Sequence, residues 1–531
     1  MNRVNILDCT LRDGGYINDF NFGKKTIKDI IEKLTKASID IIECGFLKSG
    51  ANDPNKSLFG SIEAVKNIIG IKNSKLMYVA MIQYGAISNE EIEVYTGESI
   101  DGIRVTFHEH EIDHAFILGN QLMNKGYKVF MQPVGTMTYT DEALLKLIHR
   151  INELKPFAFY MVDTLGTMYK NDLLRMFYLI DHNLDKKIAV GFHAHNNLQL
   201  SFANAQELLQ LNTPRVLIVD SSVFGMGRGA GNLNTELVTQ YINANFELHY
   251  DNLEILKIID EHIRPLSLKY RWGYDAAYYI ASITGCHPNY ATYLMNLQTL
   301  HVQDIYAILN NMDMEHRALF DKAYIGNVYL KYMNHRVDDA DVQKEVKKLL
   351  IGRKILILAP GKSLRRDADE INRIIKKEQY FVISVNFMPA GIPVDMVFVS
   401  NMRRFKDIQE LCSKASSIAK VLVTSNITTQ GNEKLSIVDY SSYINEEQCI
   451  LDNAGLMCIN FLNKLGVVKV LLAGFDGFSV NTKENYYEQA MYLDVEAERL
   501  MQMNEAISKK IKQLSTQIEI DFFKDSAYQI V

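Results

Sequence analysis

Short apolar segments rich in Val, Ile and Phe recur eight times in the first 220 residues, and this recurrence constrains the fold more than any other feature. Segments with helical apolar spacing, such as 26–37 and 141–154, separate them. Apolar runs that alternate with helices predict parallel strands joined by crossover helices. Eight such units over about 240 residues predict a (β/α)₈ barrel. The eight runs are 4–7, 39–44, 76–81, 102–105, 128–132, 158–162, 189–192 and 216–219.

The pattern changes after the eighth run. Residues from about 237 to 334 have mainly helical spacing, and a charged segment, 338–348, follows them. Strand and helix patterns then alternate again, which predicts a second α/β domain. We therefore expect a barrel domain over 1–240, a helical extension over 241–340, and a Rossmann-like α/β domain over 350–531. The later predicted strands are 354–359, 381–385, 396–399, 421–423 and 468–472.

Composition excludes several classes of partner. With 47% hydrophobic and 23% charged residues the chain has globular composition, and its net charge of −6 provides no broad positive field for nucleic acid. No run of about 18 apolar residues occurs, so no membrane partner is expected. The first 15 residues lack the apolar core of a secretory signal, which predicts a cytoplasmic protein.

Two of the predicted strands end in groups that suit a metal ion. The first runs into Arg12 and Asp13, and the seventh ends in His193 and His195. The spacing of two residues in an extended segment directs both imidazoles to the same side. An isolated H-x-H more often makes ordinary hydrogen bonds, but the carboxylate at a second strand end favours a site for a divalent ion such as Mn²⁺, Mg²⁺ or Zn²⁺.

A glycine-rich loop, 225–231, follows the eighth run. Such a loop could approach a phosphate, because barrels often bind phosphate near strands seven and eight. It could equally be a plain turn that needs glycine for its backbone angles. The sequence leaves both interpretations open.

Four motifs together resemble the DRE-TIM metallolyase superfamily, and most closely its 4-hydroxy-2-oxovalerate aldolase branch. They are LDCTLRDGG, IIECGF, GFHAHNN and GMGRGAGN, in barrel order, and the resemblance covers about residues 1–330. It implies that Arg12 stabilises an enolate oxygen and that Glu43 orients Arg12 through an ion pair. It also implies a homodimer. The metal ligands that it implies are Asp13, His193 and His195, with Asn232 as a further contact.

The chain departs from the aldolase branch at one catalytic position. Tyr16 stands where that branch has a histidine that transfers the hydroxyl proton. Tyr16 itself, His108 or His110 could take this role. The resemblance thus implies a metal-dependent aldolase that forms or cleaves a bond between a pyruvate-type enolate and an aldehyde. The alternative is a Claisen-type acyl-CoA lyase or synthase, although 223–232 lacks the cysteine of the lyases.

The C-terminal part weakly resembles the DUF115/MptE-like group and the Rossmann-like sialyltransferases. The resemblance covers about 352–480 and implies that a nucleotide or phosphorylated sugar binds near four residues, namely Gly361, Ser363, Asn386 and Asn453. A P-loop is excluded because Leu356 stands where that motif needs glycine. The last histidine is His335, so the histidine base of those transferases is absent. A nucleotide-dependent transferase in a bifunctional protein, or a role in sugar or polysaccharide precursor synthesis, remains as a hypothesis.

Overall fold

The structure is a computed structural model of the 531-residue chain. It describes residues 4–414, 420–429, 435–479, 481, 485–488, 491, 497–524 and 526–529, without the side chains of 411–414. The chain forms two compact units. One comprises 1–292 with 313–320, and the other comprises 293–312 with 321–531.

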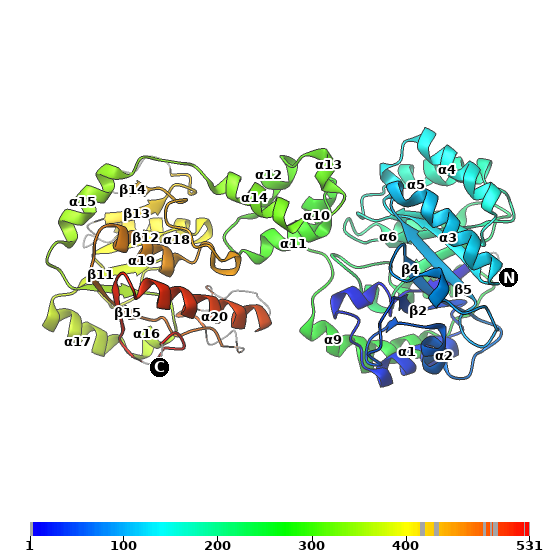
Figure 1. Ribbon diagram of the computed structural model, residues 1–531, viewed down its shortest axis with the longest axis horizontal. Helices are drawn as coiled ribbons and strands as arrows, with labels where there is room; N and C mark the ends of the chain where they lie inside the picture. The colour runs from blue at the N-terminus through cyan, green and yellow to red at the C-terminus, as the bar shows by residue number, and fades with distance from the viewer. Residues whose placement is uncertain are drawn as a thin grey trace. The chain divides into compact units, whose positions relative to one another are not determined.

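The first unit contains a closed parallel barrel (Figure 1). Strand β1 pairs in parallel with β9 on one side and with β2 on the other, which closes the sheet. The predicted (β/α)₈ barrel is therefore confirmed, and each observed strand overlaps its predicted run. The barrel strands are β1 (Val4–Asp8), β2 (Ile41–Leu47), β4 (Met77–Gln83), β5 (Gly102–Phe107), β6 (Lys128–Pro133), β7 (Ala158–Asp163), β8 (Ala189–Ala194) and β9 (Leu217–Ser221), and the two-residue β3 (Leu58–Phe59) pairs with β2.

Amphipathic helices surround the barrel. Helix α4 illustrates why they form: Thr140 caps its first turn by accepting from the Ala143 N–H at 3.2 Å, and its apolar residues recur on one buried face. The strands bury alternate side chains inside the barrel, including Phe130 and Ile218. The surrounding helices are α1 (Lys24–Lys36), α2 (Ile62–Ile69), α3 (Ile112–Asn124), α4 (Asp141–Leu154), α5 (Lys170–Asn183), α6 (Ser201–Gln210) and α7 (Thr235–Asn245).

The segment after the barrel is helical, as expected. The first helices of this segment belong to the barrel unit, and the division between the two units falls within α11. The helices are α8 (Asn252–Ile258), the π-helical η6 (Ile259–Ile263), α9 (Arg264–Lys269), α10 (Ala276–Ile283), α11 (Pro288–Asn296), α12 (Val302–Asn310), α13 (Met314–Arg317) and α14 (Lys322–Met333). Among the described helices of the whole chain, none has the length and hydrophobicity needed to cross a membrane.

The second unit is built on a seven-stranded parallel sheet, consistent with the predicted Rossmann-like domain. Its strand order is β14-β13-β12-β11-β10-β15-β16, so the order reverses direction between β10 and β15. The strands are β10 (Ile355–Leu358), β11 (Phe381–Val385), β12 (Met396–Val399), β13 (Lys420–Thr424), β14 (Leu435–Val438), β15 (Lys469–Ala473) and β16 (Glu519–Phe522).

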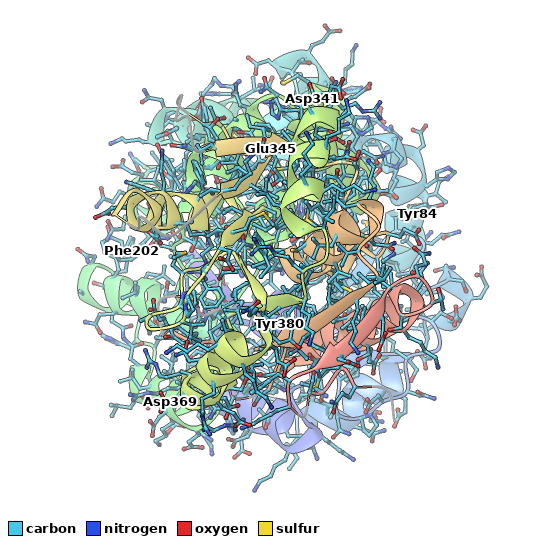
Figure 2. The ribbon with its side chains drawn as sticks, turned by 90° about the vertical axis from the view of Figure 1, so that its left-hand side faces the viewer. Tyr84, Phe202, Asp341, Glu345, Asp369 and Tyr380 are labelled. Atoms are coloured by element: carbon cyan, nitrogen blue, oxygen red, sulfur yellow. The ribbon has the colours of Figure 1, made fainter. Side chains whose placement is uncertain are left out.

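Helices cover both faces of this sheet. Residues of α17 and α18 share a core with Leu356, Val382 and Val397 on one face, and α19 packs on the other through the Phe398–Phe461 ring contact. Figure 2 shows Asp341 and Glu345 one turn apart on α15. The flanking helices are α15 (Ala340–Leu350), α16 (Ser363–Arg366), α17 (Ala368–Glu378), α18 (Met402–Lys414), α19 (Ala454–Lys464) and α20 (Ala497–Leu514).

Candidate metal centre

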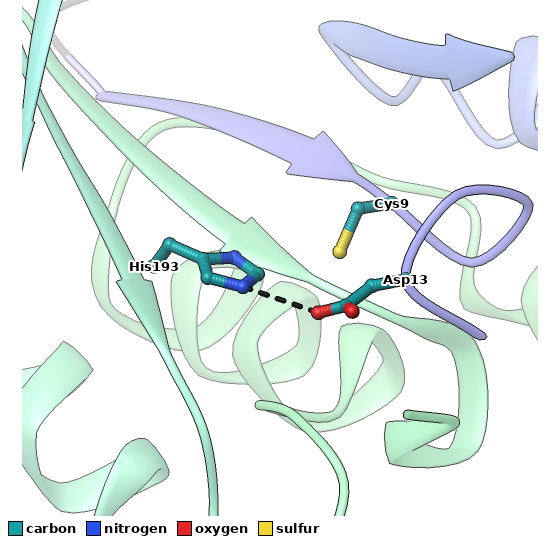
Figure 3. Close-up of side chains that lie close together, drawn as sticks. All are labelled: Cys9, Asp13 and His193. Atoms are coloured by element: carbon teal, nitrogen blue, oxygen red, sulfur yellow. Dashed lines mark ion pairs between the residues drawn. The ribbon is translucent and has the colours of Figure 1, made fainter. Parts of the chain in front are cut away.

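The ends of β1 and β8 bring three side chains of metal-ligand type together. Cys9 follows β1, Asp13 lies one turn further on, and His193 lies in β8. The backbone N–H of Asp13 donates to the carbonyl of Cys9 at 2.8 Å, which closes the turn. Ligand atoms of Cys9, Asp13 and His193 all lie within 4.8 Å of one another (Figure 3).

Two more of the predicted ligands lie beside this cluster. Oδ2 of Asp13 is 3.1 Å from Nε2 of His193 and 3.6 Å from Nε2 of His195. Asn232 forms an isolated backbone bridge with His195. Its Oδ1 is buried without a hydrogen-bond partner in the described part of the chain. The fold thus gathers groups from positions 13, 193, 195 and 232.

Burial and charge set the protonation states of this cluster. Burial alone would raise the pKa of Asp13, but Arg12, with Nη1 at 3.3 Å from Oδ1, and the two imidazoles hold that pKa well below its usual range. Burial lowers the pKa of His195 to about 4, so its ring is neutral. Nδ1 of His195 lies 3.0 Å from the Asp163 carbonyl. A proton on Nδ1 that is donated there leaves the Nε2 lone pair facing Asp13.

A buried chain of ion pairs lies behind the ligands. Nε of Arg12 donates to Oε2 of Glu43 at 2.8 Å, and Nη1 of Arg104 is 2.7 Å from the same oxygen. Arg104 also pairs with Asp220, whose Oδ2 is 3.1 Å from Nδ1 of His193. Because every member of this chain is buried, each charge depends on its opposite partner. The network joins Arg12 to His193 through three intervening side chains.

The sequence analysis missed three members of this centre. Cys9 precedes Asp13 by one turn within the first motif, which could have suggested its proximity. Arg104 interrupts an apolar strand run, and a charge there needs a buried partner. Asp220 stands at the end of the eighth run, where barrels place functional groups, but only barrel closure reveals that it meets His193.

The donor set fits a divalent ion. Both oxygens of Asp13 are buried, and none of the described residues donates a hydrogen bond to them. One carboxylate and two imidazoles are ligands that such ions accept, and the Asp220 and Asp163 contacts to the Nδ1 atoms fix the rings. Cys9 is a protonated thiol, because burial raises its pKa well above the usual range. Asp13, His193 and His195, with Oδ1 of Asn232, could therefore hold the ion.

The predicted proton-transfer residues lie in different surroundings. Tyr16 packs edge-on against Phe20, with ring centroids 5.2 Å apart, and the guanidinium of Arg228 lies 4.0 Å over its ring. His108 follows β5, where its ring stacks on His110 with centroids 5.7 Å apart. Among the described residues, no contact joins His108 to Asp13 or the metal-site imidazoles.

His287 is a further polar residue of the barrel unit, immediately before α11. Its Nδ1 accepts from the Asn289 N–H at 3.1 Å. Burial, with the charge of Arg228, lowers the pKa of His287 to about 3. Its neutral ring therefore carries its proton on Nε2 and can donate a hydrogen bond.

Comparison with known proteins identifies the family of the first unit. The family model described as HMGL-like matches residues 3–260. Residues 3–260 form an HMGL-like domain. This confirms the DRE-TIM resemblance for that range.

Relatives of the HMGL-like domain include a decarboxylase and several aldolases. An oxaloacetate decarboxylase from Mycobacterium tuberculosis is 26% identical over 239 residues, which cover 44% of this chain and 67% of that protein. A 4-hydroxy-2-oxovalerate aldolase from Carboxydothermus hydrogenoformans is 26% identical over 274 residues, which cover 50% of this chain and 78% of that protein. Pyruvate carboxylase from Rhizobium etli has a TM-score of 0.50 at 13% identity, covering 66% of this chain and 34% of that one, and shows a similar fold alone.

The second unit contains a cavity of about 210 Å³ at the carboxyl ends of β10, β11 and β15. This is where the strand order reverses, and α/β sheets bind ligands at such points. Two arginines, Arg404 and Arg499, line the cavity. Its aromatic lining consists of Phe475, Phe478, Tyr486 and Tyr528.

Three of the four residues predicted near a nucleotide line this cavity: Gly361, Asn386 and Asn453. Oδ1 of Asn386 accepts from the Ser400 N–H at 2.9 Å, and Asn453 caps α19. Ser363 lies outside this lining. Its backbone N–H donates to Oδ2 of Asp476 at 2.8 Å, and its hydroxyl contacts the other oxygen. The Asp476 carboxylate therefore occupies the position where an anion would meet the Ser363 N–H.

Proposed function

We propose that the HMGL-like domain is a divalent-metal-dependent aldolase that joins or separates a pyruvate-type enolate and an aldehyde. The observation that carries the proposal is the buried Asp13 carboxylate facing His193 and His195 beside the Arg12 guanidinium. When bound there, a divalent ion supplies Lewis acidity to the carboxylate and keto oxygen of a 2-oxo acid. Arg12 stabilises developing negative charge on the enolate oxygen without transferring a proton.

The remaining residues orient this centre. Glu43 fixes the plane of Arg12, and Asp220 fixes the ring of His193. In the cleavage direction a base removes the 4-hydroxyl proton, the bond between C3 and C4 breaks, and C3 of the enolate takes up a proton. Tyr16 is our candidate for the group that exchanges this proton, because it stands at the aldolase-branch position; burial raises the pKa of its hydroxyl, and the charge of Arg228 opposes that rise. Condensation follows the same steps in reverse.

Deuterium exchange at C3 of pyruvate tests this proposal with the full chain. We expect NMR to show exchange with Mn²⁺ or Mg²⁺, because enolisation precedes bond formation. Removal of the ion by EDTA should abolish the exchange, and re-addition should restore it. Exchange that survives removal of the ion, or no exchange with any divalent ion, would refute the proposal.

The Claisen-type alternative uses the same barrel but a different nucleophile. It predicts exchange at the methyl group of acetyl-CoA or CoA-dependent cleavage, with no requirement for an aldehyde. Measuring exchange of pyruvate and acetyl-CoA in parallel separates the two functions.

We also propose that the cavity of the second unit binds a nucleotide. Its support is the position at the strand reversal, with the side chain of Arg499 in the lining to meet a phosphate and aromatic rings in the lining to meet a planar base. A role in sugar or polysaccharide precursor synthesis would follow from pairing such a unit with an aldolase.

Replacing Arg499 tests this second proposal. We expect Arg499→Gln to weaken binding of CMP or UDP by about tenfold or more, because a charge-assisted hydrogen bond contributes about 1.5–3 kcal/mol. Calorimetry with CMP, UDP and inorganic phosphate provides the measurement. Lys509→Gln is the matched control, since Lys509 lies exposed on the same helix, paired with Glu447 at 2.6 Å. Equal affinity in both variants, or no binding by the unaltered protein, would count against the cavity as the site.

A further inference from the structure

Arg228 is held at the barrel mouth by the glycine-rich loop that follows β9. The loop folds tightly on itself: a Cβ added to Gly227 would lie 2.4 Å from Nδ2 of Asn232. The loop also packs against the start of α11, where a Cβ on Gly229 would lie 3.4 Å from Cβ of Pro288. The loop is therefore a tight turn that presents one charged side chain.

The guanidinium of Arg228 is oriented by an aromatic platform. It lies 4.0 Å from the centre of the Tyr16 ring. Tyr16 is itself fixed by edge contacts with Phe20 and Phe46, with ring centroids 5.2 and 5.9 Å away. A stacked guanidinium keeps the donors at its edge free for a carboxylate or phosphate. The platform therefore prepares Arg228 for an anion.

The positive charge of Arg228 has no carboxylate partner among the described residues. The other two arginines near the centre differ, because Arg12 pairs with Asp13 and Glu43, and Arg104 pairs with Glu43 and Asp220. Arg228 is also only half-buried, so a ligand can reach it. A cation that is stacked and unpaired at a site mouth is suited to recognise a substrate charge.

Arg228 stands close to the centre itself. The loop that carries it is tied to the segment that follows His195, because the Ala230 N–H donates to Oδ1 of Asn197 at 3.0 Å. His195 is a metal-ligand candidate, and His287 lies beside Pro288, against which the loop packs. Arg228 is thus near enough to contact a molecule that reacts at the metal centre.

We infer that Arg228 selects an aldehyde partner that carries its own anionic group, a carboxylate or a phosphate. This inference rests on the proposed aldolase function. In that function Arg12, with an ion held by Asp13, His193 and His195, would serve the carboxylate and enolate oxygens of pyruvate. The charge left for Arg228 is therefore one on the second substrate. His287, with a proton on Nε2, can add a hydrogen bond to the same molecule.

Aldehyde discrimination tests this inference in the full chain with Mn²⁺ and pyruvate. The probes are succinic semialdehyde for a carboxylate, glyceraldehyde 3-phosphate for a phosphate, and propionaldehyde as the uncharged reference. In the unaltered protein we expect kcat/KM to be higher for one or both anionic aldehydes than for propionaldehyde. Arg228→Gln should reduce kcat/KM for the preferred anionic aldehyde by about ten- to a hundredfold, mainly through KM. Arg228→Lys should retain part of the preference, because its charge remains but its planar fork is lost.

Arg150→Gln is the matched control. Arg150 also stacks on an aromatic ring, that of Phe116 at 4.5 Å, but it lies on the outer helix α4 and pairs with Asp113 at 2.8 Å. Its loss should leave aldehyde discrimination unchanged. Equal melting temperatures of the variants exclude a general loss of folding.

Pyruvate exchange separates the possible failures. If the unaltered protein exchanges the C3 protons of pyruvate and Arg228→Gln keeps the same preference for anionic aldehydes, this inference is wrong and the aldolase proposal stands. If Arg228→Gln instead raises KM for pyruvate in the exchange assay, Arg228 binds the keto acid and the inference is also wrong. If the unaltered protein shows no exchange, the proposed function fails, and the inference falls with it.

Discussion

His193→Ala is expected to abolish metal-dependent turnover while the barrel remains folded. The substitution removes the proposed ligand, whose Nε2 lies 3.1 Å from Oδ2 of Asp13. Lewis-acid stabilisation is worth several kcal/mol, so the loss of activity should be at least about a thousandfold. Asp220 keeps its contacts with Arg104 and with the Tyr160 hydroxyl at 3.0 Å. Pyruvate exchange and metal content after dialysis provide the measurements.

A histidine on the outside of the barrel provides the control for this experiment. His182 lies on α5, where Nδ1 contacts the carbonyl of Tyr178 at 2.8 Å. His182→Ala should retain both the metal and the activity. Full activity of His193→Ala, with no metal retained, would contradict the assignment of the centre.

Glu43→Gln is expected to destabilise the barrel by about 3–5 kcal/mol, as for removal of one partner from a buried ion pair. Oε2 of Glu43 contacts both Arg12 and Arg104, at 2.8 and 2.7 Å. Its side chain and that of Arg104 are fully buried. In the variant the buried guanidinium groups of Arg12 and Arg104 lose the negative charge that they share, and Arg12 is no longer held in its orientation. Urea unfolding followed by circular dichroism measures the change, and pyruvate exchange should fall in parallel.

An exposed carboxylate provides the comparison. Glu142 pairs with Lys146 at 2.6 Å on α4, with both side chains largely exposed. Glu142→Gln should change stability by less than about 0.5 kcal/mol, because exposed pairs of this spacing contribute little. A loss for Glu43→Gln as small as that for Glu142→Gln would show that the buried network does not stabilise the barrel.

The sequence predicted the barrel because each strand is a local apolar run. The sequence could also predict that Asp13, His193 and His195 lie near one another, since strand ends meet at one rim of a parallel barrel. The sequence could not predict the buried network of ion pairs behind these residues. The Arg104–Asp220 pair joins residues 116 positions apart, and a pattern within one strand cannot show which charge lies across the barrel. Local periodicity therefore predicts the strands. Which buried charges form ion pairs becomes visible only when the strands close into the barrel.

The second sheet shows where the prediction of strands from apolar runs fails. The sequence predicted five of its strands but neither β14 nor β16. Both are edge strands, and their residues are largely part-exposed, so they lack the continuous apolar run of a central strand. The sequence predicted a phosphate contact at Ser363 because it does not show that Asp476, 113 residues later in the chain, accepts from the Ser363 N–H.

The pairing of β1 with β9 also governs when the centre can exist during synthesis. Asp13 leaves the ribosome about 200 residues before the end of β9 at Ser221, and Asn232 follows still later. Translation proceeds at about 5–20 residues per second, so β9 follows β1 and its other neighbour β2 only after roughly ten seconds or more. During that interval a nascent chain exposes Asp13 and the apolar face of β1 without the histidines. The proposed metal site can therefore form only late in synthesis, and truncated chains that end before β9 cannot complete it.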